Sequence, residues 1–342
     1  MGDISMQVIT QDLISGKKVL LRYDIDVALG KGTGDRVQAE GTLRITEDYK
    51  LKAGLETLKL CLEHGSNVIM MGHIGRPNGK VVHELSVEPI RQWLVDQGYG
   101  ANLGSGRLSL LENFRFDRRE EACDPNYAQE LASMGDVYIN EAFSAHRPSA
   151  SITVLPTLLP HGAGLHFAEE VKTLIEIRNN PKKPFIAIMG GAKVTDKLLV
   201  IKILAEKADA VLIGGKLVAE IKNEQVELPK NVMVGKLNED GFDIAEETVA
   251  SWSGLISKAA MIVWNGPLGK FEEEKYNQTE NVAKIVLQSN AKIVIGGGDI
   301  IAAFNQYGLL PQAESKAFVS VGGGAMLKLI SDGTLPTIEA LK

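Results

Sequence analysis

Short apolar runs alternate with longer amphipathic segments along almost the whole chain. Many of the apolar runs are continuous and end in glycine, which is typical of strands buried on both faces of a sheet. The expected strands lie within residues 17–26, 66–72, 108–113 and 134–141 in the front half, and within 184–190, 209–215, 231–235, 260–266, 291–299 and 317–324 in the rear half.

The segments between these runs have helical patterns, as in residues 49–65 and 195–208. Strands that alternate with helices across short glycine turns predict parallel sheets covered by helices, an α/β fold. A chain of 342 residues is long for one hydrophobic core, so we expect two lobes. The proline-rich stretch 153–164 predicts a loop at the boundary, and residues 168–180 predict a helix that joins the lobes.

Composition narrows the class of protein. A net charge of −6 argues against non-specific nucleic-acid binding, although local basic pockets remain compatible with it. Cys61 and Cys123 have neither a CxxC spacing nor a histidine at metal spacing, which argues against a disulfide scaffold or a zinc site. No apolar run approaches the ~20 residues of a membrane helix, and the first residues lack a signal-peptide pattern. We therefore expect a cytoplasmic protein without a membrane partner.

In the rear half, Gly190 and Gly191 form a turn between an expected strand and an expected helix. Lys193 and Lys197 follow at i, i+4 spacing, which places both ammonium groups on one face of the first helical turn. The helix dipole disfavours cations at this end, so the two lysines suggest a bound anion such as phosphate. The alternative is a pair of solvated surface lysines.

Two triple-glycine turns, 296–298 and 322–324, repeat this arrangement. Glycine lets the backbone approach a ligand closely, and the helix that follows presents free N–H groups. One such turn is equally compatible with tight strand–helix packing. Two of them, together with the turn at Gly190, favour a shared polyanion site.

Three polar residues near these turns suit a nucleotide. Asp299 could hold Mg²⁺ on a nucleotide phosphate through its oxygens, or act as a helix N-cap, or do both. Asn265 lies at a tight turn, and Glu272 offers a carboxylate for ribose hydroxyls. The chain has no GxxxxGK[ST] loop, and its glycines at 30, 32 and 34 lack the GxGxxG spacing, which disfavours a P-loop enzyme or a standard dehydrogenase.

In the front half, four expected strands are followed by basic residues. The segments carry Arg22, then His73 with Arg76, then Arg115, and then His146 with Arg147. Ligands of open α/β sheets bind outside the carboxyl ends of the strands, and guanidinium groups match carboxylate and phosphate. Each arginine alone is more often a surface ion-pair partner, but four such segments favour an anion pocket.

Two acidic residues, Asp24 and Asp26, belong to the first of these segments. Strand periodicity places them with Arg22 on one face, where they could accept hydrogen bonds from substrate hydroxyls.

Together these motifs resemble the phosphoglycerate kinase family over nearly the whole chain and in the family's order. The segments that carry the resemblance are RYDIDV, GHIGRP, LSVEP, LLENFRF, GDVYINEAFSAHR, PFIAIMGGAKVTDK, IVWNGPLGKFE, IGGGD and VGGGA. The resemblance implies two Rossmann-like lobes joined by a helix. Residues 1–167 would bind 3-phosphoglycerate, residues 168–328 would bind the nucleotide, and residues 329–342 would return to the first lobe.

The resemblance also implies an activity and its residues. The reaction would be reversible phosphoryl transfer between 1,3-bisphosphoglycerate and Mg-ADP in glycolysis, carried out by a monomer. The 3-phosphoglycerate side would comprise Asp24, Asp26, His73, Arg76, Arg115 and Arg147. The nucleotide side would comprise Gly190, Gly191, Lys193, Lys197, Gly215, Asn265, Pro267, Glu272, Gly297, Gly298 and the Mg²⁺ ligand Asp299. The catalytic groups would be Lys50, Lys193, Gly323 and Gly324.

The chain departs from the family pattern at several positions. Lys50 stands where the family uses an arginine on the transferring phosphoryl group, and lysine keeps the charge but loses the planar fork. Arg44, six residues upstream, is the alternative cation at this position. Asp26 replaces an asparagine and adds a negative charge beside an anionic substrate. Further departures are Ala28, Lys216, Asn231, Ile300, Val321 and an AHR segment that is one residue shorter.

These departures keep a second hypothesis open. The expected mechanism is in-line transfer as the lobes close, with the glycine N–H groups, Lys193, Mg²⁺ and Lys50 or Arg44 neutralising the phosphoryl oxygens. The alternative is a non-catalytic or weakly active relative that binds 3-phosphoglycerate or nucleotide. A nicotinamide dehydrogenase is the third and weakest reading, because it would require NADH binding and hydride transfer.

Overall fold

The computed structural model describes residues 6–31, 43–191 and 194–342. The chain divides into two compact units. Unit 1 comprises Met1–Val171 with Thr334–Lys342, and unit 2 comprises Lys172–Gly333. Among the described residues, no helix has both the length and the apolar character needed to cross a membrane.

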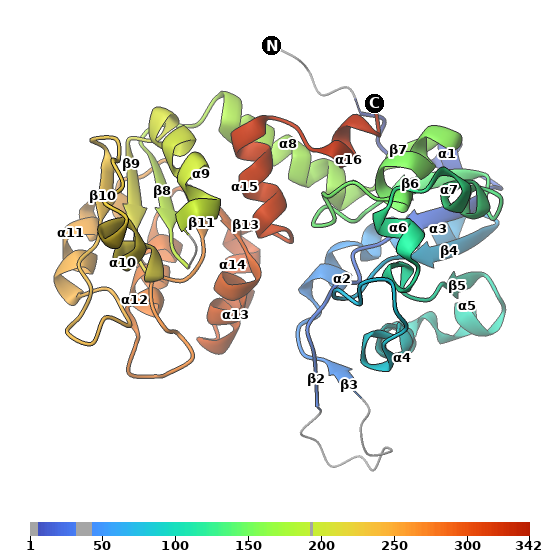
Figure 1. Cartoon of the computed structure of the whole chain (residues 1–342), viewed down its shortest axis with the longest axis horizontal. Helices are drawn as coiled ribbons and strands as arrows, with labels where there is room; N and C mark the ends of the chain where they lie inside the picture. Colours follow the sequence, from blue (N-terminus) through green and yellow to red (C-terminus); the bar gives the residue numbers. More distant parts are fainter. Residues whose placement is uncertain (1–5, 32–42, 192–193) are drawn as a thin grey trace. The chain divides into compact units, whose positions relative to one another are not determined.

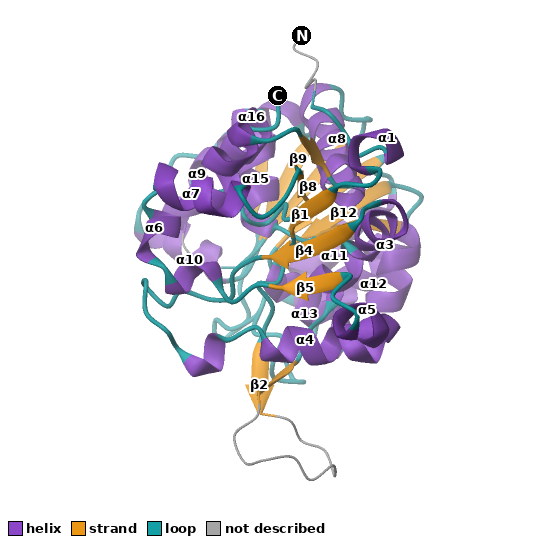
Figure 2. Cartoon of the chain, turned by 90° about the vertical axis from the view of Figure 1, so that its right-hand side faces the viewer, coloured by secondary structure: helices purple, strands orange, loops and turns teal. Residues whose placement is uncertain are grey.

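Unit 1 contains a parallel sheet in the order β5-β4-β1-β6-β7. Its strands are β1 (Lys18–Arg22), β4 (Asn67–Met71), β5 (Leu108–Leu110), β6 (Val137–Asn140) and β7 (His161–Ala163). A separate antiparallel pair joins β2 (Leu29–Lys31) to β3 (Leu43–Ile45). The helices of unit 1 are α1 (Gln11–Ile14), α2 (Tyr49–Ala53), α3 (Leu55–His64), α4 (Glu88–Leu94), α5 (Gly100–Gly104), α6 (Arg118–Glu121), α7 (Pro125–Ala132) and α16 (Pro336–Glu339). Within this unit α3 packs against β4 and α5 against β5 (Figure 2).

Unit 2 contains a second parallel sheet, in the order β10-β9-β8-β11-β12-β13. Its strands are β8 (Phe185–Met189), β9 (Ala210–Ile213), β10 (Val232–Val234), β11 (Met261–Asn265), β12 (Lys292–Gly296) and β13 (Ala317–Ser320). Its helices are α9 (Val194–Lys207), α10 (Lys216–Asn223), α11 (Glu246–Ser257), α12 (Gln278–Gln288), α13 (Gly298–Gln306), α14 (Leu310–Lys316) and α15 (Gly323–Asp332), and they flank the sheet (Figure 1). Every residue of β8, β9 and β11 is buried, as expected for strands covered on both faces.

The helix α8 (Leu165–Asn179) covers most of the segment predicted to join the lobes, and the division between the units falls inside it. All ten expected strands are present, and the prediction of an α/β fold with two parallel sheets is confirmed. The prediction of a loop over residues 153–164 is wrong in part. Helical turns run through Ala150–Val154 and Leu155–Leu158, and β7 then pairs with β6 in parallel. β7 is an outer strand, where the preceding Pro160 needs no N–H and its carbonyl accepts from Tyr138 N at 2.9 Å.

The helical pattern of residues 49–65 also divides, and the break places Lys50. A Cβ on Gly54 would lie 2.5 Å from the ring of Tyr23, so only glycine fits between α2 and α3. The Tyr23 hydroxyl donates to the carbonyl of Leu51 at 2.6 Å. This bond ties the short helix α2, and Lys50 with it, to the segment that follows β1.

Candidate functional site

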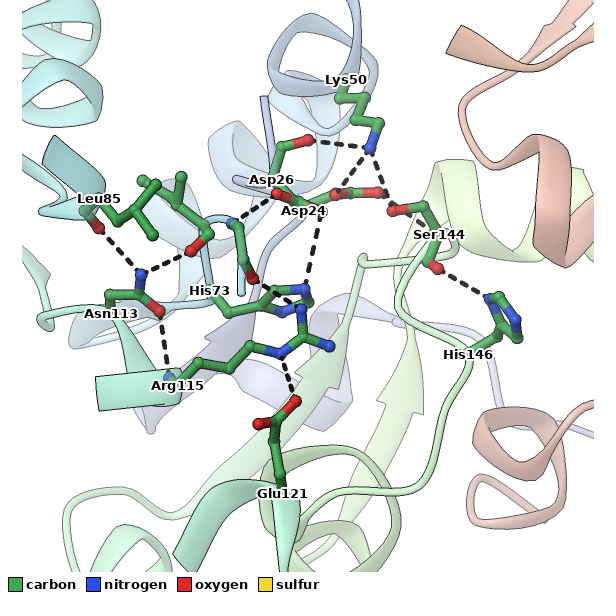
Figure 3. Close-up of polar contacts among 12 residues, drawn as sticks. Asp24, Asp26, Lys50, His73, Leu85, Asn113, Arg115, Glu121, Ser144 and His146 are labelled. Carbon is green, nitrogen blue, oxygen red and sulfur yellow. Dashed lines mark hydrogen bonds and ion pairs between the residues drawn. The ribbon is translucent and has the colours of Figure 1, made fainter. Parts of the chain in front are cut away.

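Polar side chains gather at the carboxyl ends of the strands of unit 1 (Figure 3). The front cluster is defined here as Asp24 and Asp26 after β1, Lys50 on α2, His73 after β4 and Arg115 after β5. Asp24 and His73 are buried, and the Lys50 side chain keeps 15% of its exposure. Because the strands are parallel and neighbouring, residues distant in sequence meet at one edge.

Lys50 is held by three oxygens of this edge. Its Nζ donates to the carbonyl oxygen of Asp26 at 2.9 Å and to Ser144 Oγ at 3.4 Å, and it lies 3.9 Å from Asp24 Oδ1. Asp24 Oδ2 in turn accepts from Ser144 N at 3.3 Å. The ammonium is therefore fixed at the sheet edge instead of ranging through solvent on its long side chain.

Asp26 and His73 face each other beside this lysine. Asp26 Oδ1 accepts from Gly75 N at 2.8 Å, and Asp26 Oδ2 lies 3.8 Å from His73 Nε2. Burial lowers the pKa of His73 well below its ordinary value, and the nearby charges of Arg22, Arg115 and Lys50 lower it further. His73 is therefore a neutral imidazole at physiological pH.

Arg115 is oriented by its neighbours. Its Nη1 donates to the carbonyl of Gly75 at 2.8 Å, and its Nε lies 3.3 Å from Glu121 Oε1. Asn113 Oδ1 accepts from Arg115 N at 3.1 Å, while Asn113 Nδ2 donates to Ile74 and Leu85 carbonyls at 2.8 and 2.9 Å. The buried Asn113 thus binds the β4 and β5 loops together beneath the guanidinium.

The other two arginines predicted for this site are placed differently. Arg76 and Arg147 are exposed, and the described part of the chain holds no hydrogen bond or ion pair to either side chain. His146 lies beside Arg147, and its Nδ1 donates to the carbonyl of Ser144 at 2.9 Å. Asp24, Asp26, His73 and Arg115 are therefore held by bonds to neighbouring residues of the edge. Arg76 and Arg147 are exposed to solvent.

The predicted common strand face of Arg22, Asp24 and Asp26 is wrong. β1 ends at Arg22, and the next residues form tight turns in which Ile25 N donates to the Tyr23 carbonyl at 3.1 Å. Arg22 is 1% exposed and its guanidinium bonds to His73. Neither a separate role for Arg22 nor the part of Ser144, which accepts from Lys50, was predicted from the sequence. An arginine inside an apolar strand was the available signal, because such a charge requires buried partners.

In unit 2 the glycine turns contact one another through the backbone. Gly190 N donates to the Asn265 carbonyl, Gly191 N to the Pro267 carbonyl and Gly215 N to the Leu268 carbonyl, each at 2.8 Å. A Cβ on Gly190 would lie 2.1 Å from the Pro267 oxygen. These three N–H groups are occupied within the protein. Close contact between the turns therefore uses these donors, and they are not available to a ligand.

The two triple-glycine turns also meet. A Cβ on Gly323 would lie 2.4 Å from the Cα of Gly297, and Gly297 has a φ of 125° that side-chain-bearing residues rarely adopt. Asn265 Nδ2 donates to the carbonyl of Gly296 in the same place. Tight packing accounts for these glycines.

The helix N-termini beyond these turns keep unused donors. α13 begins at Gly298 and α15 at Gly323, and their first bonds of the helical type are Ile301 N to Gly297 O and Met326 N to Gly322 O. Within the described residues no acceptor receives the amides of Gly298, Gly323 and Gly324. Both helix ends are therefore open to an anion.

The charged residues predicted for unit 2 lie around these turns. Lys197 Nζ donates to the carbonyl of Gly190 at 2.6 Å, whereas Lys193 lies outside the described residues. Glu272 and Asp299 are exposed. Asp299 is not the N-cap of α13, because Gly297 occupies that position. No group of three His, Cys, Asp or Glu side chains among the described residues could enclose a metal ion.

Comparisons with known proteins show what the whole chain is similar to. The family model described as phosphoglycerate kinase matches residues 9–237 and 217–333. A phosphoglycerate kinase of Herpetosiphon aurantiacus is 35% identical, with 99% of each chain covered, and one of Moorella thermoacetica is 33% identical, with 96% of this chain and 97% of that protein covered. The solved phosphoglycerate kinase of Pyrococcus horikoshii superimposes with a TM-score of 0.79 at 25% identity over 98% of both chains. That of Coxiella burnetii gives 0.77 at 27% identity, over 96% of this chain and 97% of that one.

Proposed function

This chain belongs to the phosphoglycerate kinase family, and we propose on that basis how its two units hold the two substrates. The family assignment makes the protein a kinase of glycolysis. Its reaction is reversible transfer of a phosphoryl group between 1,3-bisphosphoglycerate and ADP, giving 3-phosphoglycerate and ATP. The comparisons cover nearly the whole chain and favour this reading over a non-catalytic relative.

The observation that carries the proposal is the front cluster. Lys50, His73 and Arg115 meet at one sheet edge, and Arg76 and Arg147 extend from the loops of the same edge. 3-Phosphoglycerate carries a phosphate and a carboxylate, which guanidinium forks bind bidentately. We assign Arg76, Arg115 and Arg147 to these anionic groups, and Asp24 and Asp26 to the hydroxyl and to the orientation of Lys50 and His73.

Unit 2 supplies the nucleotide side of the proposal. The open amides at the starts of α13 and α15 suit phosphate oxygens. Gly190, Gly191, Gly215 and Pro267 shape the surface through contacts between their backbones, and Lys197 and the predicted Lys193 add positive charge. We assign Asn265 to fixing the Gly296 turn and the exposed Glu272 to the ribose hydroxyls.

A magnesium ion fits this side of the molecule. Asp299 is an exposed carboxylate in the first turn of α13, and Mg²⁺ prefers one or two carboxylates together with phosphate oxygens. Because no group of three ligating side chains is found among the described residues, the nucleotide phosphates would supply the remaining ligands. When bound, the ion would neutralise charge on those phosphates.

Lys50 is the front cation proposed for the transfer itself. In the ATP-forming direction a β-phosphate oxygen of ADP attacks phosphorus, and the bond from phosphorus to the acyl oxygen of 1,3-bisphosphoglycerate breaks, leaving the carboxylate of 3-phosphoglycerate. Positive charge at the sheet edge stabilises the oxygens of the transferring group. Lys50 is bonded to Asp26 within the front cluster, whereas Arg44 lies exposed on β3. These contacts favour Lys50 over Arg44. We further propose that the protein is a cytoplasmic monomer. Residues 1–167 would bind 3-phosphoglycerate, residues 168–328 would bind the nucleotide, and residues 329–342 would return to the first domain.

The test is a coupled assay of ATP formation from 1,3-bisphosphoglycerate and Mg-ADP. We expect turnover by the wild type and a loss in kcat on the order of 10²- to 10³-fold in Lys50→Met, with nucleotide affinity unchanged. Lys50→Arg keeps the charge and is expected within tenfold of the wild type. Absence of turnover in wild type and Lys50→Arg, with nucleotide binding intact, would refute the catalytic assignment. A rate that appears only in Lys50→Arg would show that lysine fails in this role.

A further inference from the structure

We propose that Arg22 is a positioning residue, which holds the His73 imidazole as the tautomer with a proton on Nε2. Glu120 holds Arg22 in turn through the hydroxyl of Ser151. The functional part of this inference rests on the proposed place of His73 in the 3-phosphoglycerate site. The tautomer itself does not depend on that assignment and is measured separately below.

The contact between Arg22 and His73 defines the tautomer. Arg22 Nη2 lies 2.7 Å from His73 Nδ1, and both side chains are buried. A guanidinium has donors and no acceptor, so His73 Nδ1 must accept and carries no proton. The proton of the neutral ring is then on Nε2, the atom that faces Asp26 Oδ2 at 3.8 Å.

Arg22 is fixed by bonds in two further directions. Its Nη1 donates to the Tyr23 carbonyl at 2.9 Å, and its Nε donates to Ser151 Oγ at 3.1 Å. A planar guanidinium satisfies these three acceptors at once, whereas a lysine ammonium on a flexible stem could not hold the same geometry. The guanidinium fork of Arg22 therefore sets both the position of the His73 ring and the ring nitrogen that carries the proton.

The acid beneath this fork is Glu120, which is 2% exposed. Its Oε1 accepts from Ser151 Oγ and from Ser149 Oγ, each at 2.6 Å, and its Oε2 accepts from Ser151 N at 3.0 Å. Ser151 Oγ thus accepts a hydrogen bond from Arg22 and donates one to Glu120. This chain of hydrogen bonds links α6, the segment after β6 and β1 to the ring of His73.

The charged groups that face His73 favour the same state. Arg22 on β1, Arg115 after β5 and Lys50 on α2 are positive, and Asp26 is negative. Burial and the three positive groups lower the pKa of His73 far below its ordinary value. His73 then offers an anionic substrate one N–H donor without adding a fourth positive charge.

The first experiment measures the tautomer in the wild-type protein without substrate. Long-range proton–nitrogen correlation spectra of ¹⁵N-labelled protein distinguish the two neutral forms, and His73→Asn identifies the signals. We expect a single Nε2–H form of His73 that does not titrate across the pH range around its ordinary pKa of about 6.5. A proton on Nδ1, or ordinary titration of this ring, would overturn the proposal even if 3-phosphoglycerate binds as expected.

The second experiment removes the fork. In Arg22→Met we expect mixed tautomers of His73, titration of the ring, and a KM for 3-phosphoglycerate raised about tenfold, with a smaller change in kcat. The raised KM should fall again at lower pH, where His73 becomes protonated. Ser151→Ala, which breaks the connection to Glu120, is the milder variant and should raise KM by roughly threefold.

Tyr138→Phe is the matched control. It removes another buried bond to the same segment, from the Tyr138 hydroxyl to the Ser151 carbonyl at 2.9 Å, and leaves the bonds of Arg22 in place. We expect this variant to keep the tautomer and the KM of the wild type. If Tyr138→Phe shifts the tautomer and KM as much as Arg22→Met, Arg22 has only a structural role and the proposal fails.

Discussion

The carboxyl ends of the two sheets are built by opposite means. In unit 1, the edge is lined by charged side chains, and those of the front cluster are oriented by bonds to another side chain or to the backbone of a loop. In unit 2, the edge is lined by glycine turns whose backbones touch, with donors left at two helix ends. The difference teaches that the two sites tolerate different changes. The first depends on charge and side-chain orientation, the second on the absence of side chains.

The largest expected effect comes from adding one methyl group to unit 2. In Gly190→Ala the new Cβ would lie 2.1 Å from the Pro267 carbonyl oxygen, and neither backbone can yield locally. We expect the free energy of unfolding to fall by about 3 kcal/mol and nucleotide affinity to fall at least tenfold. Urea unfolding and titration with Mg-ADP measure the two effects.

Gly254→Ala is the control for this substitution within the same unit. Gly254 lies in α11 with nothing within 4 Å of a built Cβ, so alanine should raise the free energy of unfolding by about 0.5–1 kcal/mol. Nucleotide affinity should stay unchanged. If the two alanine variants had the same unfolding free energy and the same nucleotide affinity, close contact between the turns would not be the reason for glycine at position 190.

The second prediction concerns a buried carboxyl beneath the unit 1 edge. Burial raises the pKa of Glu141 from its ordinary 4.5 to about 7, which corresponds to about 3 kcal/mol at about 1.4 kcal/mol per pH unit. The folded state therefore binds a proton more tightly than the unfolded chain. Stability from this group is full below pH 4.5 and is lost as the pH rises to about 7.

Glu141→Gln isolates this contribution. The amide keeps an oxygen that can accept from His166 N, as Glu141 Oε1 does at 3.0 Å, and does not titrate. We expect the difference in unfolding free energy between wild type and variant to change by about 3 kcal/mol between pH 4.5 and 7.5. Hydrogen exchange of the β6 amides should show this change in unfolding free energy with pH. The β11 amides in unit 2 should show no such change. A pH-independent difference would contradict the raised pKa.

The smallest expected effect tests charge in the front cluster. In Asp26→Asn the retained oxygen can still accept from Gly75 N, but one negative charge beside the proposed substrate is lost. We expect KM for 3-phosphoglycerate to fall roughly three- to tenfold at low salt, about 1 kcal/mol. The gain should shrink as salt is added. A KM that rises would show that the bond from the carboxylate to the substrate hydroxyl outweighs its repulsion of the anionic groups of the substrate.

The fold was predictable because many of its strands are continuous apolar runs followed by glycine, and those of β8, β9 and β11 are buried throughout. The long apolar runs at β8 and β11 are compatible with little other than buried strands. β7 has only three residues, and it is a strand because it pairs with β6. The break between α2 and α3 was not predictable, since it depends on the ring of Tyr23, far along the chain, meeting Gly54. Local pattern does not reveal a contact of that kind.

The candidate site divides in the same way. His73 and Arg115 were predicted as site residues from their residue type and their position after a strand. In the structure His73 lies beside Asp26, and Arg115 donates to the carbonyl of Gly75. The inward turn of Arg22 and the use of the Gly190 amide by Asn265 depend on tertiary contacts. Sequence spacing shows which groups are near an edge, but it does not show which of them are already bonded.

The division of the chain has a consequence for its synthesis on the ribosome. Unit 2 is one continuous stretch, so its sheet can form as soon as Gly333 emerges. Unit 1 must wait for the last residues, because Asn140 in β6 donates to Thr337 at 2.9 Å and Leu335, Ile338 and Leu341 are fully buried. A chain cut before Thr334 would contain every strand of both sheets and still lack the segment that packs against β6. Most of unit 1 is therefore synthesised before unit 2, but unit 1 completes its packing after unit 2.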